Sequence, residues 1–323
     1  MNKQRPLVSI AMCTYNGSRF LEEQLISLVQ QSYSNIEIII TDDGSSDDTV
    51  DMIKRYMAQY SNIKLSENET NLGFVKNFEK AISLCRGEYI ALADQDDIWK
   101  LHKIETFVNA IGTHSLIYSD AELIDADSNM TGSFLIQPKK SLLKGPCASA
   151  FIFDNCVSGN TLMFQRALLD HVLPIPDEVR FHDQWIAFVA ATYGAITYTD
   201  EAMTKYRRYA DQVTHVTKAK AKGFIQRLEE KKKRKMWFAQ NRYEHIQTFL
   251  QLDNEPSVNE LLIQLLEHYK NFETCFYNVP LLKKVWKERD QLFAMEPCGR
   301  KRAIQTIKTA IGLRLYRMTL FTI

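Results

Sequence analysis

The sequence predicts an α/β fold in which a mostly parallel sheet is flanked by helices and followed by a C-terminal helical extension. Up to His215, short apolar runs typical of buried strands alternate with segments of helical apolar spacing. Such alternation implies right-handed crossovers between parallel strands. Several of the runs end in clusters of turn residues and carboxylates, as expected at strand ends. After His215 the strand-like runs stop and basic helical segments follow.

The first part of the predicted sheet contains four strand-like runs, three of them followed by a helical segment. The strands are expected at residues 7–12, 36–41, 63–65 and 88–93, and the helices at 20–31, 48–59 and 74–85. Ligands bind at the carboxyl ends of the strands in such sheets. The loops Thr14–Asn16, Asp42–Asp43 and Asp94–Asp97 all fall at that edge, so we expect them to meet in one site.

The second part continues the domain with a less regular pattern. We expect helices at 100–111, 166–171 and 182–193, strands at 115–120 and 195–198, a small-residue turn leading into a strand over 157–164, and an irregular polar stretch at 121–150. Beyond it, helices are expected at 218–251, 255–276, 280–295 and 301–322. No internal repeat or low-complexity tract interrupts this order.

The charge distribution divides the chain into two unlike regions. Residues 1–215 hold 19 basic and 28 acidic side chains, a net charge of −9, whereas residues 216–323 hold 21 and 11, a net charge of +10. This asymmetry predicts two regions with different partners. The basic run Lys231–Lys235 alone does not indicate nucleic-acid binding, because the first region is acidic.

The cysteines and the N-terminal residues favour a cytoplasmic protein. The six cysteines contain no C-x-x-C pair, which argues for a reduced compartment and against a zinc site. Residues 1–6 lead into the first apolar run without a signal-peptide core. No apolar stretch reaches the ~20 residues that a membrane-spanning helix needs.

The sequence Asp94-Gln95-Asp96-Asp97 is the strongest candidate site. Three carboxylates in four residues repel one another unless a cation neutralises them. Oxygen ligands at i and i+2, here Asp94 and Asp96, suit Mg²⁺ or Mn²⁺ bound together with phosphate oxygens. An acidic surface turn is the alternative, since short motifs recur by accident. The position directly after a core strand, in line with Asp42–Asp43 and Asp183, favours the metal site.

Three ordered motifs resemble the signatures of family-2 nucleotide-sugar glycosyltransferases. They are residues 8–17, 41–47 and 94–99, and the resemblance covers roughly residues 6–215. It implies a GT-A fold, with a Rossmann-like sheet, a nucleotide-binding half over about residues 1–100 and an acceptor half over about residues 101–215. The basic region 216–323 forms a separate helical part.

The form of the motifs is most similar to the bacterial rhamnosyltransferase-like branch, which builds cell-wall rhamnan and O-antigen polysaccharides. The residues that carry this resemblance are Asp94–Trp99, His182–Trp185 and Tyr206–Arg208. That branch usually reads His-Asp-Trp and Tyr-Arg-Gln-His. Here Gln184 precedes Trp185, and Arg208 and Tyr209 replace Gln-His, so the sugar is left open.

The resemblance assigns roles by position. Thr14, Tyr15 and Asn16 would line the nucleotide pocket, and Asp42 or Asp43 would accept a hydrogen bond from the imide N–H of uracil or thymine. Lys76, Asp94 and Gln95 would also bind the nucleotide sugar, and Asp94 and Asp96 would hold the metal and diphosphate. Asp183 matches the catalytic base of inverting members, which takes the proton of the acceptor hydroxyl. A helix-capping carboxylate is the alternative for Asp183.

Other residues have two interpretations each. Trp99 and Trp185 either stack on sugar faces or belong to the core. The turn Ser158-Gly159-Asn160, with His182, either shapes the sugar or acceptor pocket or only leads into a strand. Arg207 and Arg208 either contact the diphosphate or solvate a loop.

The basic region 216–323 has three interpretations. It lies on an anionic membrane, it forms a helical dimerisation element that makes a homo-oligomer, or it is a solvated face. Membrane contact ranks first because the positive charge coincides with an apolar, amphipathic tail. Such contact would place the protein on the inner face of the cell membrane.

The sequence therefore predicts an inverting, metal-dependent glycosyltransferase. It would move a sugar, with rhamnose a candidate, from a UDP- or dTDP-linked donor to a growing cell-surface polysaccharide or lipid-linked oligosaccharide. One alternative is an inactive scaffold that binds sugar nucleotides or polysaccharide. Another is a nucleotidyltransferase, which needs a glycine-rich phosphate loop after the first strand, where Cys13–Arg19 lacks the glycine repeat.

Overall fold

The chain divides into two compact units in the computed structural model, which describes residues 5–209, 224–275 and 277–311. Unit 1 comprises Met1–Phe151, Asn155–Ile175 and Phe181–Tyr209, and unit 2 comprises Ile152–Asp154, Pro176–Arg180 and Ala210–Ile323. The domain boundary predicted at residue 215 lies outside the described residues.

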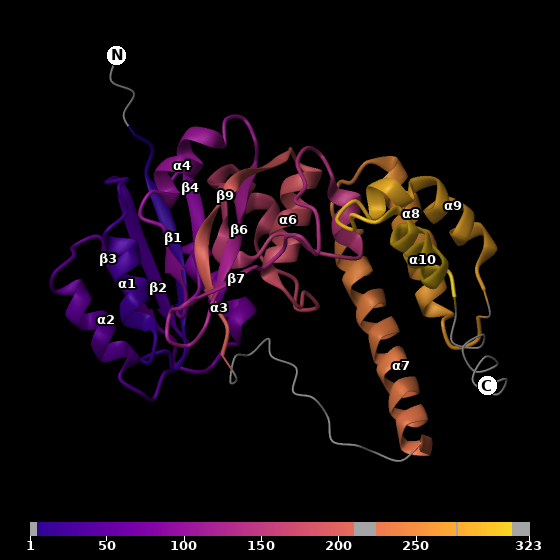
Figure 1. Cartoon of the computed structure of the whole chain (residues 1–323), viewed down its shortest axis with the longest axis horizontal. Coiled ribbons are helices and arrows are strands. Elements are labelled where there is room, and N and C mark those ends of the chain that lie inside the picture. The colour runs from indigo at the N-terminus through magenta and orange to yellow at the C-terminus, as the bar shows by residue number, and fades with distance from the viewer. Residues whose placement is uncertain (1–4, 210–223, 276, 312–323) are drawn as a thin grey trace. The chain divides into compact units, whose positions relative to one another are not determined.

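Unit 1 is an α/β unit built on one nine-stranded sheet, which confirms the predicted fold class (Figure 1). The strand order is β3-β2-β1-β4-β8-β6-β9-β5, with β7 paired to β6. The first four strands of this order are mutually parallel, and β8 is antiparallel to both of its neighbours. The strands are β1 (Val8–Thr14), β2 (Ile36–Asp42), β3 (Ile63–Glu67), β4 (Tyr89–Ala93), β5 (Ile98–Trp99), β6 (Leu116–Ile124), β7 (Met130–Phe134), β8 (Leu162–Gln165) and β9 (Ile196–Arg207).

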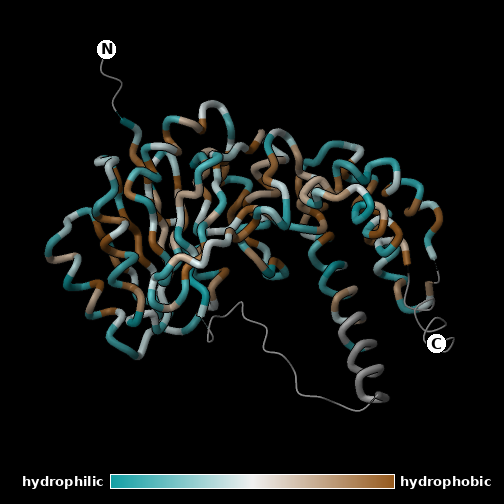
Figure 2. The backbone as a smooth tube through the Cα atoms, in the orientation of Figure 1, coloured by the Kyte–Doolittle hydropathy of each residue, from teal (hydrophilic) through white to brown (hydrophobic). Residues whose placement is uncertain are grey.

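Helices cover both faces of this sheet because its strands are apolar on both sides. On one face, α1, α2 and α4 bury leucine, isoleucine and phenylalanine side chains against alternate residues of β1 and β2. On the other face α3 packs, and Asn77 exchanges hydrogen bonds with Thr41. Hydrophobic residues accordingly gather along the central strands (Figure 2). The helices are α1 (Leu21–Val29), α2 (Thr49–Met57), α3 (Phe74–Ser83), α4 (Lys103–Ala110), α5 (Leu169–Val172) and α6 (His182–Thr192), with 3₁₀ turns η1 (Ala148–Ile152), η2 (Gly159–Thr161) and η3 (Arg166–Leu168).

The stretch 121–150, predicted to be irregular, contains a β-hairpin. Strand β6 continues to Ile124 and pairs with β7, and Asp125 closes the turn by accepting hydrogen bonds from the backbone N–H groups of Asp127 and Asn129. Every residue of β7 is exposed, so its sequence shows none of the apolar alternation that indicates a strand.

Unit 2 is helical, as predicted for the C-terminal region. Its helices are α7 (Phe224–Phe249), α8 (Pro256–Lys270), α9 (Val279–Leu292) and α10 (Gly299–Thr309). Residues 312–322 of the last predicted helix lie outside the described residues. Within the described part of the chain, no helix is long and apolar enough to cross a membrane.

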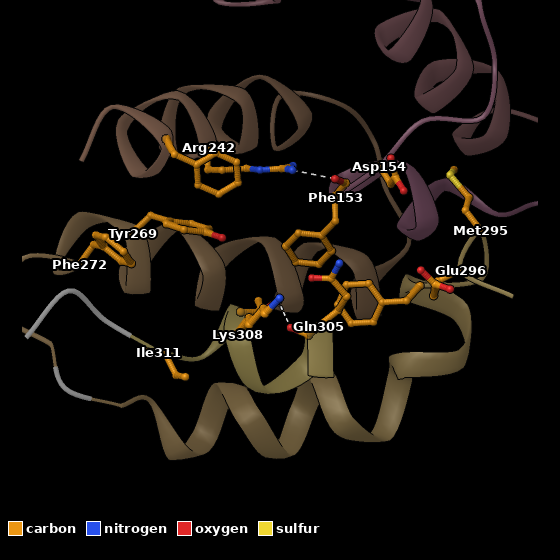
Figure 3. Close-up of a pocket in the computed structure, with 13 residues that line it drawn as sticks. Phe153, Asp154, Arg242, Tyr269, Phe272, Met295, Glu296, Gln305, Lys308 and Ile311 are labelled. Carbon is orange, nitrogen blue, oxygen red and sulfur yellow. Dashed lines mark hydrogen bonds between the residues drawn. The ribbon is translucent and has the colours of Figure 1, made fainter. Parts of the chain in front are cut away.

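Unit 2 encloses a cavity of about 440 Å³ with aromatic walls (Figure 3). The rings of Phe153 and Phe293 stack at 5.4 Å between centroids. The guanidinium of Arg242 donates to the backbone oxygens of Ile152 and Phe153, at 2.6 and 2.7 Å. These bonds fix the short segment Ile152–Asp154 within this unit.

The amino-terminal edge of the sheet in unit 1 is held by one buried carboxylate, Glu37. It accepts hydrogen bonds from the Ser9 hydroxyl at 2.7 Å, from the backbone N–H and side chain of Arg86, and from Lys64 at 3.2 Å. Burial by itself raises the pKa of Glu37, but these hydrogen bonds outweigh it and lower the pKa to about 2.

We expect Glu37→Gln to lower the free energy of unfolding of unit 1 by about 1–3 kcal/mol at pH 7, because a neutral amide satisfies fewer of these donors. The ionised carboxylate stabilises the fold above its unfolded pKa, and this stabilisation is lost as the pH falls towards 2. The difference from wild type, measured by denaturant unfolding, should therefore shrink from pH 7 to pH 3. Identical unfolding midpoints at pH 7 would contradict this assignment.

Candidate functional site

Three loops meet at the carboxyl-terminal edge of the sheet, as the sequence predicted. The loop after β1 contacts the loop after β2, because the backbone N–H of Asn16 donates to Ser45 at 2.8 Å and the Asn16 side chain accepts from Ser46 at 2.8 Å. It also contacts the loop after β4. The Gln95 amide accepts from the N–H of Tyr15 at 2.8 Å and donates to its carbonyl at 3.0 Å.

Asp42 and Asp43 are both buried, but their carboxylates differ in how many hydrogen bonds they accept. Asp42 accepts four, from the Thr14 hydroxyl, the hydroxyl and N–H of Ser45, and the N–H of Gly44. A carboxylate has about four acceptor positions, so Asp42 is saturated. Asp43 accepts three.

The three donors to Asp43 come from the loop that precedes α3. Its Oδ1 accepts from Asn68 and from the N–H of Leu72, both at 2.8 Å, and its Oδ2 accepts from the N–H of Gly73 at 2.9 Å. One acceptor position of Asp43, on Oδ2, therefore has no donor among the residues that the structure describes. This difference distinguishes two neighbouring aspartates that the sequence leaves equivalent.

Asp94 and Asp96 leave oxygens open in a charged, poorly solvated position. Desolvation by the surrounding protein, and then the charges of Asp97, Asp96 and Asp183, raise the pKa of Asp94 well above its ordinary value. Desolvation also raises the pKa of Asp96, whose carboxylate accepts a hydrogen bond from the Tyr209 hydroxyl at 2.8 Å. Crowded carboxylates with unused oxygens are the donor set that a hard divalent cation prefers.

The third carboxylate of the cluster, Asp97, is structural. It is fully buried and accepts hydrogen bonds from the backbone N–H of Arg207 at 3.0 Å and from the Asn160 side chain. Burial, and then the charge of Asp96, raise its pKa to about 7. Asp97 thereby holds β9 and η2 against the loop that carries Asp94 and Asp96.

Lys103, which the sequence analysis missed, lies buried beside this cluster. Its ammonium donates to the backbone oxygen of Asn160 at 2.6 Å and to the Thr204 hydroxyl at 3.1 Å, and it lies 3.4 Å from the centre of the Trp99 ring. Burial lowers the pKa of Lys103, while the charges of Asp97 and Asp94 oppose that change. A lysine in a predicted helix is normally solvated, and its four-residue spacing from Trp99 is the one signal for this contact.

Asp183 lies at the N-terminus of α6 and faces the turn Ser158–Asn160, although 23 residues separate Asn160 from Asp183 in the sequence. Its carboxylate accepts from the N–H of Gln184 at 2.6 Å and from the N–H of Gly159. Burial raises the pKa of Asp183 to about 6, and these hydrogen bonds limit the rise. The charge of Asp183 is among those that raise the pKa of Asp94, so the two carboxyls are close enough to influence each other electrostatically.

His182 packs beneath the same turn. Its ring stacks on Phe78 with centroids 4.1 Å apart, and neither ring nitrogen has a hydrogen-bond partner among the described residues. Burial lowers its pKa to about 3, so the ring is neutral. A Cβ atom at Gly159 would lie 2.9 Å from Nε2 of His182, which explains why a glycine occupies this position.

Several predicted contacts do not fit the structure. Trp99 and Trp185 are each only 2% exposed and belong to the core, where the Trp185 indole donates to the carbonyl of Val172, so neither ring is available to stack on a sugar. Asn160 is fully buried and holds Asp97. Lys76 is engaged by Glu79 and by the carbonyl of Ile175, which turns its ammonium to the protein itself.

The two arginines predicted to contact the diphosphate differ. Arg207 is fully buried, and its guanidinium donates to the Asp96 carbonyl at 2.8 Å and to Ser128 at 2.8 Å. It supports the acidic loop from within rather than facing a ligand. Arg208 is exposed, with its guanidinium 5.3 Å from the centre of the Tyr206 ring.

Comparison with known families and proteins gives a consistent result. Residues 9–169 match the family model described as "Glycosyl transferase family 2". An uncharacterised glycosyltransferase of Haemophilus influenzae is 28% identical over 228 residues, which are 65% of this chain and 68% of the relative. The putative glycosyltransferase EpsE of Bacillus subtilis is 39% identical over 110 residues, 34% of this chain and 40% of the relative. The first three relatives are matched over 60–68% of their length.

Solved structures share the fold. Staphylococcus aureus TarS, residues 1–349, in complex with UDP, superposes with a TM-score of 0.58 at 18% identity and covers 97% of this chain and 92% of that chain. The mannosyltransferase PcManGT of Pyrobaculum calidifontis, in complex with GDP-Man and Mn²⁺, gives 0.53 at 16% identity, covering 99% and 80%. At these identities the likeness concerns the fold alone.

The family match includes the loops after β1, β2 and β4 and the turn at Gly159, and it ends before Asp183. The geometry of the site and the family match agree with the enzyme class predicted from the sequence. Residues 9–169, about half of the chain, are therefore similar to family 2 glycosyltransferases, and the chain has the fold of GT-A glycosyltransferases.

Proposed function

We propose that the chain is an inverting, metal-dependent glycosyltransferase that moves a sugar from a nucleotide-diphosphate donor to a hydroxyl of a surface polysaccharide or a lipid-linked oligosaccharide. The observation that carries this proposal is the grouping of Asp94, Asp96 and Asp183. Asp94 and Asp96, on the loop after β4, and Asp183, at the start of α6, come from two segments that are distant in the sequence, and the charges of Asp96 and Asp183 both raise the pKa of Asp94. Rhamnose remains the candidate sugar on the form of the sequence motifs.

Asp43, rather than Asp42, is proposed to recognise the base. Its open acceptor position on Oδ2 suits the imide N–H of uracil or thymine, whereas Asp42 has no acceptor position left. Thr14, Tyr15 and Asn16 would border the same pocket, because their loop is tied to the Asp42 turn and to Gln95. A UDP- or dTDP-linked donor follows from this assignment.

Asp94 and Asp96 are proposed to hold Mg²⁺ or Mn²⁺, with the donor's phosphate oxygens as further ligands. The open oxygens and raised pKa values of these carboxyls fit such a cation. A bound cation supplies neutralisation of the charge that develops on the departing diphosphate. Among the described residues no group of three or more His, Cys, Asp or Glu side chains is arranged around a metal position. Of the two arginines predicted to contact the diphosphate, Arg208 is the exposed one, and it is proposed to make that contact.

Asp183 is proposed to be the general base. Its N–H donors hold the carboxylate in place, and with a pKa of about 6 it is mostly ionised at neutral pH yet basic enough to accept the acceptor's proton. Ser158, Gly159 and His182 would border the sugar or acceptor next to it. His182, which is buried and neutral, would act by supporting the turn at Gly159.

We expect Asp183→Asn to reduce kcat by about 10²–10⁴-fold, because the amide cannot accept the proton. The affinity for the nucleotide sugar, measured from the rise in melting temperature that the sugar causes, should stay within about a factor of two of the wild-type affinity. The matched control is Asp51→Asn on the exposed face of α2, which should leave both unchanged. Wild-type activity in Asp183→Asn would contradict the assignment.

The pH profile tests the same residue. The base acts when deprotonated, so wild-type kcat/KM should rise with pH and level off above an apparent pKa near 6. Initial rates from pH 5 to pH 8 at saturating Mn²⁺ would measure it. A profile that is flat across this range would contradict Asp183 as the base.

We expect EDTA to abolish transfer and added Mn²⁺ or Mg²⁺ to restore it. In Asp96→Asn, one cation ligand is neutralised, so restoration should need a higher Mn²⁺ concentration than in wild type or Asp51→Asn. Titration of initial rates with Mn²⁺ would measure this difference. Full activity of wild type in EDTA would argue against metal dependence while leaving the transferase assignment intact.

We expect UDP- or dTDP-sugars, and not GDP-sugars, to raise the melting temperature. Asp43→Asn should weaken that binding by about tenfold or more, since one acceptor for the imide is lost. Asp42→Asn should instead lower the melting temperature of the free protein, because all four acceptor positions of Asp42 serve the loop. Stabilisation by GDP-sugars equal to that by UDP-sugars would exclude this mode of recognition.

A further inference from the structure

Helix α10 exposes its large apolar residues and buries its small ones. Ile304 and Ile307 are 41% and 43% exposed, whereas Thr306 and Ala310 are fully buried. A helix at the surface of a globular protein normally turns its isoleucines inward. The small residues let α10 approach its neighbours closely, and the two isoleucines are left as a separate outward stripe.

Basic residues surround this stripe. Arg300, Lys301, Arg302 and Lys308 lie within four positions of Ile304, and α10 contains no carboxylate. Lys301 and Arg302 form ion pairs with Glu296 and Asp290, at 3.6 and 3.4 Å. Arg300 and Lys308 have no ion pair within the described residues. The sequence continues without a carboxylate from Gly299 to Ile323, where it carries six basic residues.

Helix α9, which is paired with α10, has an exposed stripe of the same kind. The N–H of Asn278, the N-cap of α9, donates to the carbonyl of Ala310 at 2.9 Å, and Arg302 donates to Glu296 after the end of α9. Val279 and Trp286, seven positions apart and therefore on one side of α9, are 49% and 45% exposed. Lys283 lies between them. We call this helix pair, Val279–Thr309, the α9–α10 hairpin.

We propose that the α9–α10 hairpin docks on an anionic lipid surface, with Ile304 and Ile307 inserted at the headgroup level and Arg300 and Lys308 against acidic headgroups. Exposed isoleucine and tryptophan interspersed with uncompensated cations is the composition of helices that lie in the membrane interface. A neutral apolar partner would leave the cations without counter-charges. The positive charge of α10 therefore favours a partner surface that is both apolar and negatively charged. This surface goes beyond the transfer reaction and does not depend on it.

The test uses the full chain and vesicles in a flotation assay at about 0.1 M salt, where surface charges are only partly screened. One set of vesicles is phosphatidylcholine, and the other contains phosphatidylcholine and phosphatidylglycerol at three to one. We expect wild type to float with the anionic vesicles and to bind neutral ones at least about tenfold more weakly. Raising the salt should weaken the anionic binding.

Two double variants separate the contributions. Ile304→Ser with Ile307→Ser removes the apolar stripe, and Arg300→Gln with Lys308→Gln removes the unpaired charges. Each should reduce binding to anionic vesicles by about tenfold. The matched control is Ile263→Ser on α8, where the isoleucine is 56% exposed but lies within a turn of Glu260 and Glu267. That variant should float like wild type.

Every outcome decides the proposal. It is overturned if wild type fails to bind anionic vesicles, or if the Ile304/Ile307 variant binds as tightly as wild type. Self-association of wild type without lipid, lost in the same variant, would assign the stripe to a second copy of the chain instead. All variants change exposed side chains, and unchanged melting temperatures would show that they fold.

Discussion

The neutralisation of buried charge around Asp97 is the interaction on which the rest of the site depends. Lys103, Asp97 and Asn160 meet in a region closed to water, and Arg207 donates its backbone N–H to the same carboxylate. Unpaired, either the ammonium or the carboxylate would carry a desolvation cost of several kcal/mol. Together they fix β9, η2 and the loop after β4 in one arrangement. The same loop carries Asp94 and Asp96, the two carboxylates proposed to bind ligands.

The two edges of the sheet in unit 1 are electrostatic opposites. At the amino-terminal edge, Glu37 is surrounded by donors, and its pKa is lowered to about 2. At the carboxyl-terminal edge, the pKa values of Asp94, Asp96 and Asp97 are all raised. The ionised Glu37 stabilises the fold at neutral pH. Ionisation of the crowded carboxyls at the carboxyl-terminal edge lowers the stability of the fold, as is common at sites that bind ligands.

The sequence was sufficient for the parallel half of the sheet and for the meeting of its loops. Val8–Thr14, Ile36–Asp42 and Tyr89–Ala93 are buried over most of their length and therefore show as continuous apolar runs. The position of Asp94 at the end of such a run follows directly. By contrast, β7 is exposed along its whole length and leaves no apolar pattern, so its pairing with β6 was not predicted.

The ligand contacts that the structure does not support have a common physical cause. For Trp99 and Arg207 they were one of two interpretations and rested on residue type, since indoles stack on sugars and cations bind phosphates, and for Lys76 the contact rested on its position in the sequence. Whether such a side chain faces a ligand is decided by long-range contacts, such as that of Lys76 with the carbonyl of Ile175. The distinction between Asp42 and Asp43 has the same origin. It depends on Asn68, Leu72 and Gly73, whose approach to Asp43 only the tertiary structure specifies.

The raised pKa values also imply that binding and folding are coupled at this edge. A carboxyl whose pKa is raised in the native state stabilises the fold below its unfolded pKa, and that stabilisation is lost as the pH rises through the native value. The cluster of Asp94 and Asp96 is therefore in its less favourable condition whenever both carboxyls are ionised. The cation and donor diphosphate proposed for this edge would relieve the repulsion jointly, because the cation would neutralise the carboxylates and the phosphates would supply further ligands to it. Either one alone relieves less, so the two ligands should bind cooperatively, and the cooperativity should weaken at low pH as the carboxyls become protonated.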